Sequence, residues 1–457
     1  MGKMACSRRC LLGLLLFLLL AVPSWAQQEH AVLLPERPAT PWADFAMEGG
    51  LRRWGDWYWM QRDGVSDLVS MNYVDGYLWG PSGTTLGRLL GPSCARLELR
   101  PTVRYADARR AWVAHGALRY VLRPERFAWL EAFGGQGTDD FDAAPVLAEP
   151  WRGVASAIFG RNDFKLYERT AAGVRASFAA GRALQLSGRL SYEGRRRLEN
   201  HRRRNLFRTV GAPNVPQVRG RDASDGTWWL RRRERLLRLD VQADYVPGRM
   251  LYVMDDLTTL AHTAPPTFTL RAEVGTGLDG GDDGSGHRGS FLSLEARVAQ
   301  TLTPPSGPHA WRYLVSAGAF PLRHGASLPD WHHLDASSFW WQRPEPRPAT
   351  AGPADTRDMG DLTRLRLLTA YELSTDRAWA EAHFEWNSTC MALGRLVQDD
   401  ALREFLQLHL AQVASAPLHT ELTYGIDLGR QLRLSATVGL DGGTWDGAAF
   451  TLSISKK

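Results

Sequence analysis

Residues 162–200 read NDFKLYERTAAGVRASFAAGRALQLSGRLSYEGRRRLEN, and this stretch decides the fold. Its second half alternates, with Leu184, Leu186, Gly188, Leu190 and Tyr192 on one face and Gln185, Ser187, Arg189, Ser191 and Glu193 on the other. Because successive side chains of a strand point to opposite faces, this pattern predicts a strand with one apolar and one polar face. The short, glycine-containing link at 179–183 predicts a turn back onto a preceding strand. Strands of about ten residues or more favour a membrane-spanning barrel.

The first 26 residues have the pattern of a signal peptide. Lys3, Arg8 and Arg9 precede an apolar run at 11–22, and small residues lead to a predicted cleavage site after Ala26. An uncleaved membrane anchor is the alternative, but the run is shorter than the roughly 20 residues that a spanning helix needs. We therefore expect the mature chain to be exported.

Composition narrows the class of protein. The formal charge of +6 falls to +3 without the three cations of the signal peptide, which is too mild to indicate nucleic-acid binding. No later run of about 18 apolar residues predicts a spanning helix. The chain nevertheless carries 18 Trp, 12 Tyr and 16 Phe, and its mean hydropathy is negative. Outer-membrane barrels combine an apolar outer band and aromatic girdles with a polar lumen; a secreted soluble β-sandwich shares the aromatic content.

The alternation recurs along the chain and predicts an all-β fold, an antiparallel up-and-down transmembrane β-barrel of about 14–16 strands. We divide the chain into a signal peptide (1–26), an N-terminal lead-in (27–66) and the barrel (67–457). The hairpin described above supplies two of the expected strands. The others lie at 72–80, 96–105, 111–121, 126–134, 235–245, 267–278, 290–299, 311–320, 362–373, 378–387, 404–413, 420–428, 431–440 and 448–455. Residues 51–60 fit either a strand or a short interfacial helix. Pro101 predicts an unpaired backbone site or a bulge.

Several connections are distinctive. Residues 151–160 are expected to form a short helix in the lumen or at its mouth. The strongly basic stretch 195–235 reads as a solvated loop, with attraction to anionic lipopolysaccharide or lipid headgroups as the alternative. The acidic loop 279–289 lacks the complete ligand set of a calcium hand and is read as a solvent loop. Expected partners are outer-membrane lipid, lipopolysaccharide and the outer-membrane assembly machinery.

The sequence predicts no cofactor and no metal site. No phosphate loop, zinc motif, haem-attachment motif or Gly-x-Ser-x-Gly elbow is present. Cys94 and Cys390 are the two cysteines of the mature chain, and whether they pair is open.

Weak catalytic candidates are His383, Glu385 and His332, which could meet as an acid/base site in a barrel hydrolase. His383 and Glu385 share a strand face, as expected for an ordinary lumen lining, so the sequence favours a structural role for them. Lys165 with Glu168, and Glu193 with Arg189, are instead candidates for lumenal ion pairs that brace the barrel or hold a plug.

Several motifs resemble, in order, a family of Bacteroidota outer-membrane barrels of undefined function that usually follows a carboxypeptidase-regulatory-like domain. The motifs are NYVDG at 72–76, NDFKLYE at 162–168, SYEGRRRLEN at 191–200, YVPG at 245–248, DWHH at 330–333 and STDRAWAEAHFE at 374–385. Arg197 departs from the proline usual in that family, and no regulatory-like domain precedes the barrel part here. The resemblance implies an outer-membrane barrel with a structural, transport or envelope-biogenesis role. The alternatives are the barrel hydrolase and the secreted β-sandwich.

Overall fold

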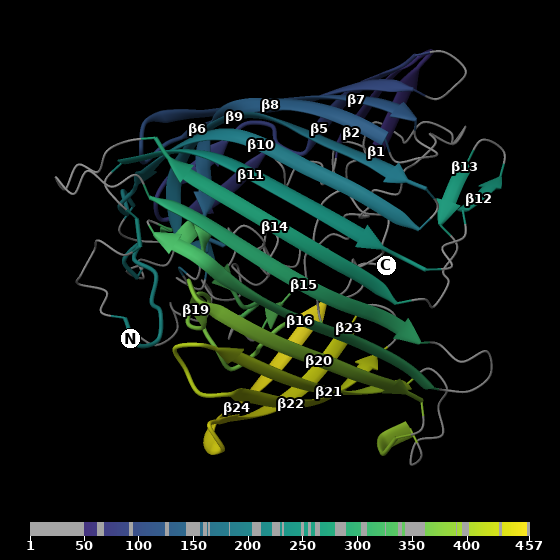
Figure 1. Ribbon diagram of the computed structural model, residues 1–457, viewed down its shortest axis with the longest axis vertical. Coiled ribbons are helices and arrows are strands. Elements are labelled where there is room, and N and C mark those ends of the chain that lie inside the picture. Colours follow the sequence, from purple (N-terminus) through teal and green to yellow (C-terminus); the bar gives the residue numbers. More distant parts are fainter. Residues whose placement is uncertain are drawn as a thin grey trace, which may run out of the picture.

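A computed structural model describes residues 50–61, 68–90, 95–123, 128–142, 156–158, 162, 165–181, 183–202, 212–221, 229–230, 233–247, 251–254, 257–260, 266–278, 289–302, 309–324, 326–336, 341–342, 362–389, 391–394, 402–428 and 432–454. In this part of the chain the fold is almost entirely antiparallel β, as predicted (Figure 1). Neither the signal peptide nor Cys94, Cys390 and the loop 279–288 lies within the described residues. No described helix has the length and hydropathy needed to cross a membrane.

One sheet of 20 strands forms the wall of the molecule. Six of the 20, β1 to β5 and β18, are two to six residues long, which leaves 14 long strands in the described residues. The long strands are β6 (Arg96–Ala106), β7 (Ala111–Arg123), β8 (Ala128–Asp140), β9 (Leu166–Ala180), β10 (Leu184–Arg197), β11 (Arg233–Tyr245), β14 (Thr267–Gly277), β15 (Ser290–Leu302), β16 (His309–His324), β20 (Ala378–Ser388), β21 (Leu402–Val413), β22 (His419–Leu428), β23 (Leu432–Asp441) and β24 (Thr444–Ile454).

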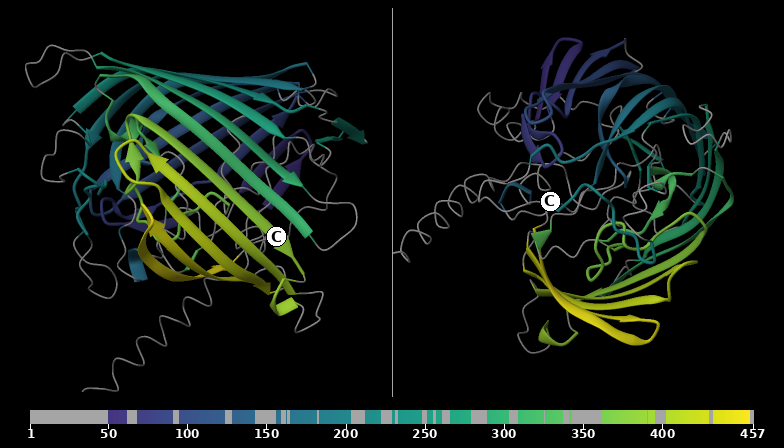
Figure 2. Two further views of the ribbon diagram at one scale, coloured as in Figure 1. Left: turned by 60° about the horizontal axis from the view of Figure 1, so that its bottom comes forward. Right: turned by 90° about the vertical axis from the view of Figure 1, so that its left-hand side faces the viewer.

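The long strands form an up-and-down meander in which each pairs antiparallel with the next. The sheet curls around a central space, as the end-on view of Figure 2 shows. The hairpin predicted from the alternation at 184–193 is confirmed, since β9 and β10 pair in register from Leu184↔Ala180 to Arg197↔Tyr167. The sequence pattern therefore predicted this hairpin correctly.

The N-terminal short strands differ from the expectation. Residues 51–60 form a hairpin of β1 (Gly50–Trp54) and β2 (Trp57–Gln61). The strand expected at 72–80 is instead the hairpin of β3 (Val69–Asn72) and β4 (Gly76–Trp79), because NYVDG makes a turn. β5 (Thr84–Leu89) pairs with the first part of β6, and β4 pairs with its end. Pro101 lies between these two paired segments, which fits the unpaired backbone site expected there.

The two ends of the sheet do not pair with each other within the described residues. β1 pairs with β2 alone, and β24 pairs with β23 and, in parallel, with the two-residue strand β18 (Trp341–Gln342). We call the boundary between β1 and β24 the seam. Within the described residues the sheet is thus barrel-shaped, as predicted, but no strand pairing closes it across the seam.

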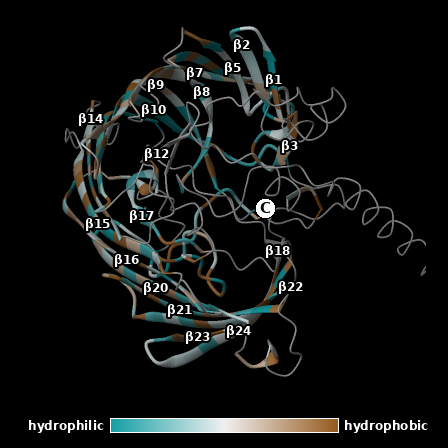
Figure 3. Cartoon of the chain, turned by 90° about the vertical axis from the view of Figure 1, so that its right-hand side faces the viewer, coloured by the Kyte–Doolittle hydropathy of each residue, from teal (hydrophilic) through white to brown (hydrophobic). Residues whose placement is uncertain are grey.

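The wall has an apolar outer face and a polar inner face, and hydrophobic and hydrophilic residues alternate along its strands (Figure 3). On β10, Leu190 and Tyr192 are 44% and 40% exposed, whereas Ser191 and Glu193 are 1% and 0% exposed. The same alternation places large apolar side chains outward along the sheet, including Leu99, Leu130, Val174, Leu239, Leu270, Val315, Leu408, Leu422 and Val438. This distribution is the reverse of a water-soluble protein, in which apolar side chains are usually buried.

The inner space contains segments of the connection between β16 and β20. We call residues 326–336 and 362–377 the plug; it includes a 3-10 helix, η3 (Leu328–Asp330), and the small pair β17 (His332–His333) and β19 (Ser374–Thr375). Figure 3 places β17 inside the curve of the sheet. The strand expected at 362–373 is wrong, because these residues form bends and turns whose leucines are buried in the plug.

Two features are peripheral. β12 (Leu251–Met254) and β13 (Leu257–Leu260) form a separate hairpin beyond the wall (Figure 1). Of the helix expected at 151–160, residues 156–158 are described and adopt a helical turn. Tyr73 donates a hydrogen bond of 3.5 Å to the Ser156 carbonyl oxygen, so this turn contacts the β3–β4 hairpin.

Candidate functional site

The NYVDG turn shows how a short motif positions a buried charge. Asn72 Oδ1 accepts hydrogen bonds from the N–H groups of Val74 at 2.9 Å and Asp75 at 2.6 Å, which closes the turn. Gly76 has a φ of +78°, and a Cβ there would lie 1.9 Å from Asp107 Oδ1. The turn directs the fully buried Asp75 carboxylate toward β8, where it accepts from the Thr138 hydroxyl at 2.6 Å.

Asp75 is joined to the NDFKLYE motif by an arginine. Arg109 Nε lies 3.0 Å from Asp75 Oδ1, and Arg109 Nη1 lies 2.8 Å from Glu168 Oε2. Arg196 of β10 contacts the same Glu168 oxygen at 2.7 Å. Glu168 therefore does pair with cations at this end of the wall, and the described partners are arginines.

Lys165 lies at the start of β9 and contacts the main chain. Its Nζ donates to the carbonyl oxygens of Asn162 at 2.8 Å and Pro213 at 2.7 Å, and its N–H donates to the Tyr371 hydroxyl at 2.9 Å. These contacts tie Lys165 to the plug and to the β10–β11 connection, and the predicted pairing with Glu168 is not among them. Next to it, Asn214 donates to the carbonyl oxygens of Leu166 and Leu198.

Glu193 is the centre of an arginine cluster on the inner wall. Arg169 and Arg189 each lie 2.7 Å from Glu193 Oε1, and Arg195 lies 3.1 Å from Oε2. The structure thus brings the candidates Arg189 and Glu193 together. Arg195 also contacts Asp330 Oδ1 of the plug at 2.7 Å. Since Arg195, Glu193 and Asp330 have 0–3% exposed side chains, this chain of charges fixes the DWHH segment to the wall.

The second part of the plug is held by carboxylates at the opposite wall. Glu421 of β22 accepts hydrogen bonds from the N–H groups of Arg366 at 2.7 Å and Leu367 at 2.9 Å. Arg219 bridges Glu372 of the plug at 2.6 Å and Asp441 at the end of β23. The Glu421 bonds satisfy main-chain N–H groups of this irregular segment, which buried backbone requires.

Apolar side chains also pack the plug against the wall. One cluster of buried side chains comprises Phe141, Tyr167, Val218, Trp229, Leu230, Leu328, Trp331 and Tyr371. A second comprises Leu236, Phe291, Phe320, Leu334, Ala336, Leu365, Leu368, Leu373, Trp379, Ala411 and Val413. Both clusters join plug residues to inward-facing wall residues, so the plug packs like a protein core rather than lying loosely in the lumen.

Burial shifts the pKa of two plug side chains. It raises the pKa of Tyr371 well above its usual value, an effect that the neighbouring Asp140 increases. The Tyr371 hydroxyl therefore keeps its proton and donates it to Asp140. Burial lowers the pKa of His333 to about 3. His333 is consequently neutral at physiological pH, with its ring nitrogens 2.7 Å from Ser374 Oγ and 3.0 Å from the Leu328 carbonyl oxygen.

Two of the three catalytic candidates share a neighbour, because the Glu381 carboxylate bonds the His383 ring and also interacts electrostatically with His332; Glu385 has other partners. The His383 ring contacts His409 Nδ1 at 2.9 Å and Glu381 Oε2 at 3.2 Å. Glu385 accepts from Arg312 Nε at 2.8 Å and from Gln407. His332 stacks on Trp379, with ring centroids 4.0 Å apart and 11° between planes. These contacts are of a kind that a polar lumen wall and a packed plug also contain.

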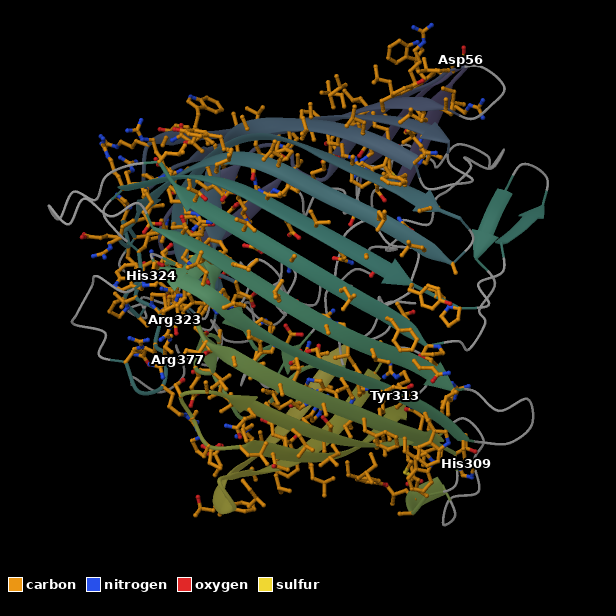
Figure 4. The ribbon with its side chains drawn as sticks, in the orientation of Figure 1. Asp56, His309, Tyr313, Arg323, His324 and Arg377 are labelled. Atoms are coloured by element: carbon orange, nitrogen blue, oxygen red, sulfur yellow. The ribbon has the colours of Figure 1, made fainter. Side chains whose placement is uncertain are left out.

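Sequence reasoning missed Asp75, Arg109, Asp330 and Glu421 as members of this arrangement. Asp75 and Asp330 lie in motifs that were singled out, but their partners lie far away in the chain and no local pattern identifies them. The outcome is several groups of contacts at one end of the wall, the end where β9 begins and β10 ends. We call this the motif end; Figure 4 shows it on the left, around Arg323 and Arg377.

A family model described as "Family of unknown function (DUF5686) C-terminal domain" matches residues 56–426. A search of curated protein sequences returned no match.

Several solved structures are similar. CdiB from Acinetobacter baumannii aligns over 84% of this chain and 57% of that chain, with 10% identity and a TM-score of 0.38, so this chain spans little more than half of its length. A porin refined at 1.8 Å aligns over 78% of this chain and 90% of that chain, with 10% identity and a TM-score of 0.27. Pseudomonas aeruginosa OccK2 (OpdF), in complex with glucuronate, aligns over 82% and 89%, with 9% identity and a TM-score of 0.28.

Proposed function

We propose that this chain, which belongs to the family of unknown function whose C-terminal domain it matches, is a plugged β-barrel of the bacterial outer membrane. Export after signal-peptide cleavage, outer-membrane lipid and lipopolysaccharide as its surroundings, and insertion by the assembly machinery are parts of this proposal. The origin in Bacteroidota and the association with a regulatory-like domain stay predictions.

The observation that carries the proposal is the inverted distribution of side chains across the wall. On β22, Glu421 and Thr423 are fully buried, whereas Leu422 between them is 44% exposed. In water, such an apolar surface would be unfavourable by about 25 cal/mol for each Å² exposed, and monomeric soluble proteins rarely expose contiguous apolar patches of this kind. In a bilayer the same surface contacts hydrocarbon, and the charges are sheltered in the lumen.

Aromatic side chains at the strand ends support the same placement. Trp79, Tyr105 and Trp112 lie together at the motif end, with Tyr105 and Trp112 rings 5.3 Å apart. Tyr245 and Phe268 lie at the opposite end, 6.3 Å apart. Such aromatic groups are typical of the two interfaces of a membrane-spanning barrel.

Structural, transport and envelope-biogenesis roles are all candidates, and the plug argues against one form of transport, an open diffusion pore. Salt bridges, main-chain hydrogen bonds and two apolar clusters hold it in the lumen. A lumen filled in this way does not serve as an open diffusion pore. Passage through it requires displacement of the plug, and the motif end is the part of the wall that would respond to such displacement.

The three longest connections of the sheet follow β8, β10 and β16, and they also lie at the motif end. Because the longer loops of such barrels are extracellular, this favours placement of the motif end outside the cell.

Fractionation of the expressed chain tests the class. We expect it in the outer-membrane fraction, extracted by detergent, with folded and heated samples migrating differently on a gel. Recovery in soluble form without detergent would support the secreted β-sandwich and contradict the proposal.

Conductance in planar bilayers tests the plug. We expect the wild-type chain to conduct far less than an open porin. Replacement of residues 362–373 by a Gly-Ser segment of equal length should raise the conductance, provided that heat-dependent migration shows a folded wall. A wild-type conductance equal to that of the replacement variant would refute a closed lumen.

A further inference from the structure

Three side chains with metal-ligating groups converge beside the seam, at the motif end. His419 is the first residue of β22, Asp441 is the last of β23, and Asp446 is the third of β24. The register places His419 opposite Asp441, and Asp441 opposite Thr444. One ligand atom from each of the three side chains lies within 4.8 Å of the others.

The distances between these atoms are close to those of a metal site. His419 Nδ1 lies 2.6 Å from Asp441 Oδ1 and 3.9 Å from Asp446 Oδ2. Two ligands of a tetrahedral Zn²⁺ at about 2.0–2.1 Å from the ion are roughly 3.3 Å apart. The two observed distances bracket this value, so small side-chain rotations would bring all three atoms into ligating positions.

Groups outside the ligand set hold two of the three side chains in the required orientation. Glu421 Oε1 lies 3.0 Å from His419 Nε2 and holds a proton there, which leaves Nδ1 facing the carboxylates. In this structure Nδ1 is at hydrogen-bond distance from Asp441 Oδ1, so a metal ion would replace the Nδ1 proton. The second oxygen of Asp441 is bound by Arg219. A carboxylate behind a ligating histidine and a hydrogen bond to a ligating carboxylate are the outer partners that metal sites in proteins commonly have.

The position also allows an ion to reach the site. The His419 side chain is fully buried, whereas those of Asp441 and Asp446 are 19% and 27% exposed. An imidazole with two carboxylates suits Zn²⁺ and similar transition metals, whereas Ca²⁺ and Mg²⁺ prefer ligand sets made of oxygen alone.

We propose that His419, Asp441 and Asp446 bind a divalent transition metal, for which Zn²⁺ is the best match, with a fourth position open to water. The ion would join three consecutive strands at the edge of the sheet, where the described part of the chain gives β24 only the two-residue β18 on its outer side. Through Glu421 and Arg219, which bind Leu367 and Glu372, the site would also be connected to the plug. The site therefore fastens the seam edge to the plug, independently of the role proposed above.

Metal binding to the full chain tests this proposal. The chain is purified in detergent without a histidine tag, stripped with a chelator and titrated with Zn²⁺ by calorimetry, and bound metal is quantified by mass spectrometry. We expect one equivalent of Zn²⁺ and, with Co²⁺ as a substitute, visible absorption bands of a low-symmetry N/O site. His419→Ala should abolish binding.

Asp446→Asn separates ligation from folding. The described contact of Asp446 is the 3.9 Å approach to His419, and its side chain is partly exposed. This variant should fold normally and bind Zn²⁺ at least tenfold more weakly. Zn²⁺ should raise the temperature of the heat-dependent gel shift in the wild type and not in Asp446→Asn. His324→Ala, an exposed histidine at the same end (Figure 4), is the matched control and should bind like the wild type.

Any of three results would overturn the site. One is a wild-type chain that binds no more Zn²⁺ than His419→Ala. A second is unchanged affinity in Asp446→Asn, and the third is a loss in His324→Ala as large as in the site variants. If His419 merely pairs with its carboxylates, His419→Ala will lower stability with no measurable Zn²⁺ binding in either protein, and this case of the first result also rejects the metal site.

Discussion

The two faces of the same strands obey opposite rules. On the outer face of β10 and β11, leucine, valine and tyrosine are 40–48% exposed. On the inner face, the Glu193 carboxylate lies within 3.1 Å of each of three arginine side chains. The difference is what the proposed membrane placement requires: an outer face suited to a solvent that offers no hydrogen bonds, and an inner face whose charges are paired. Changes that are tolerated on one face should therefore be costly on the other.

The largest effect is expected from the inner charge cluster. Glu193→Gln leaves Arg169, Arg189 and Arg195 without their shared carboxylate, and one partner lost from a buried charge group costs about 3–5 kcal/mol. Urea unfolding of the chain in detergent micelles measures this loss. The exposed Glu199→Gln is the control and should change stability by no more than about 0.5 kcal/mol. Equal effects of the two substitutions would mean that the inner face is hydrated like an ordinary surface.

A charge on the outer face should have a somewhat smaller effect that depends on depth. Leu239 lies at the middle of β11 and is 44% exposed. Leu239→Arg should destabilise the chain in lipid vesicles by about 2–4 kcal/mol, and Tyr245→Arg, at the strand end, by about 0–1 kcal/mol. Denaturant titration in vesicles gives both values. If Leu239→Arg were neutral, the outer face would be in contact with water.

A smaller effect is expected where the plug meets the wall. Tyr371→Phe removes the hydroxyl that donates to Asp140 and accepts from the Lys165 N–H at 2.9 Å. An unsatisfied buried group costs about 1–3 kcal/mol. Hydrogen exchange should become faster in the plug and remain unchanged in β22, whereas the exposed Tyr192→Phe should change neither. Faster exchange throughout the wall would show that plug and wall unfold as one unit.

Local alternation predicted the wall because it depends only on a period of two. The expectation of 235–245 for β11 missed two residues at its start, and the hairpin of β9 and β10 agrees in both strands. The same reasoning failed at 362–373, because apolar residues there face the interior of the plug instead of lipid. A short apolar run looks alike in a strand and in a packed irregular segment.

The site was less predictable because its contacts join distant parts of the chain. The pairing of Arg189 with Glu193 could be predicted, since residues four apart on a strand share a face. The bond between Lys165 and Tyr371 spans 206 positions, and that between Arg219 and Asp441 spans 222. No local pattern encodes such partners. The seam, which is unpaired within the described residues, was unpredictable for the same reason, since pairing there would join the two ends of the chain.

Spin-label accessibility along β10 tests the central account most directly. Single cysteines are placed at positions 188–193 in a chain whose Cys94 and Cys390 are replaced by serine, and the protein is reconstituted in lipid vesicles. We predict that labels at 188, 190 and 192 collide with oxygen, which concentrates in lipid, and that those at 189, 191 and 193 do not. Labels at 188, 190 and 192 that respond instead to a water-soluble nickel reagent would contradict the assignment of the outer face to the membrane.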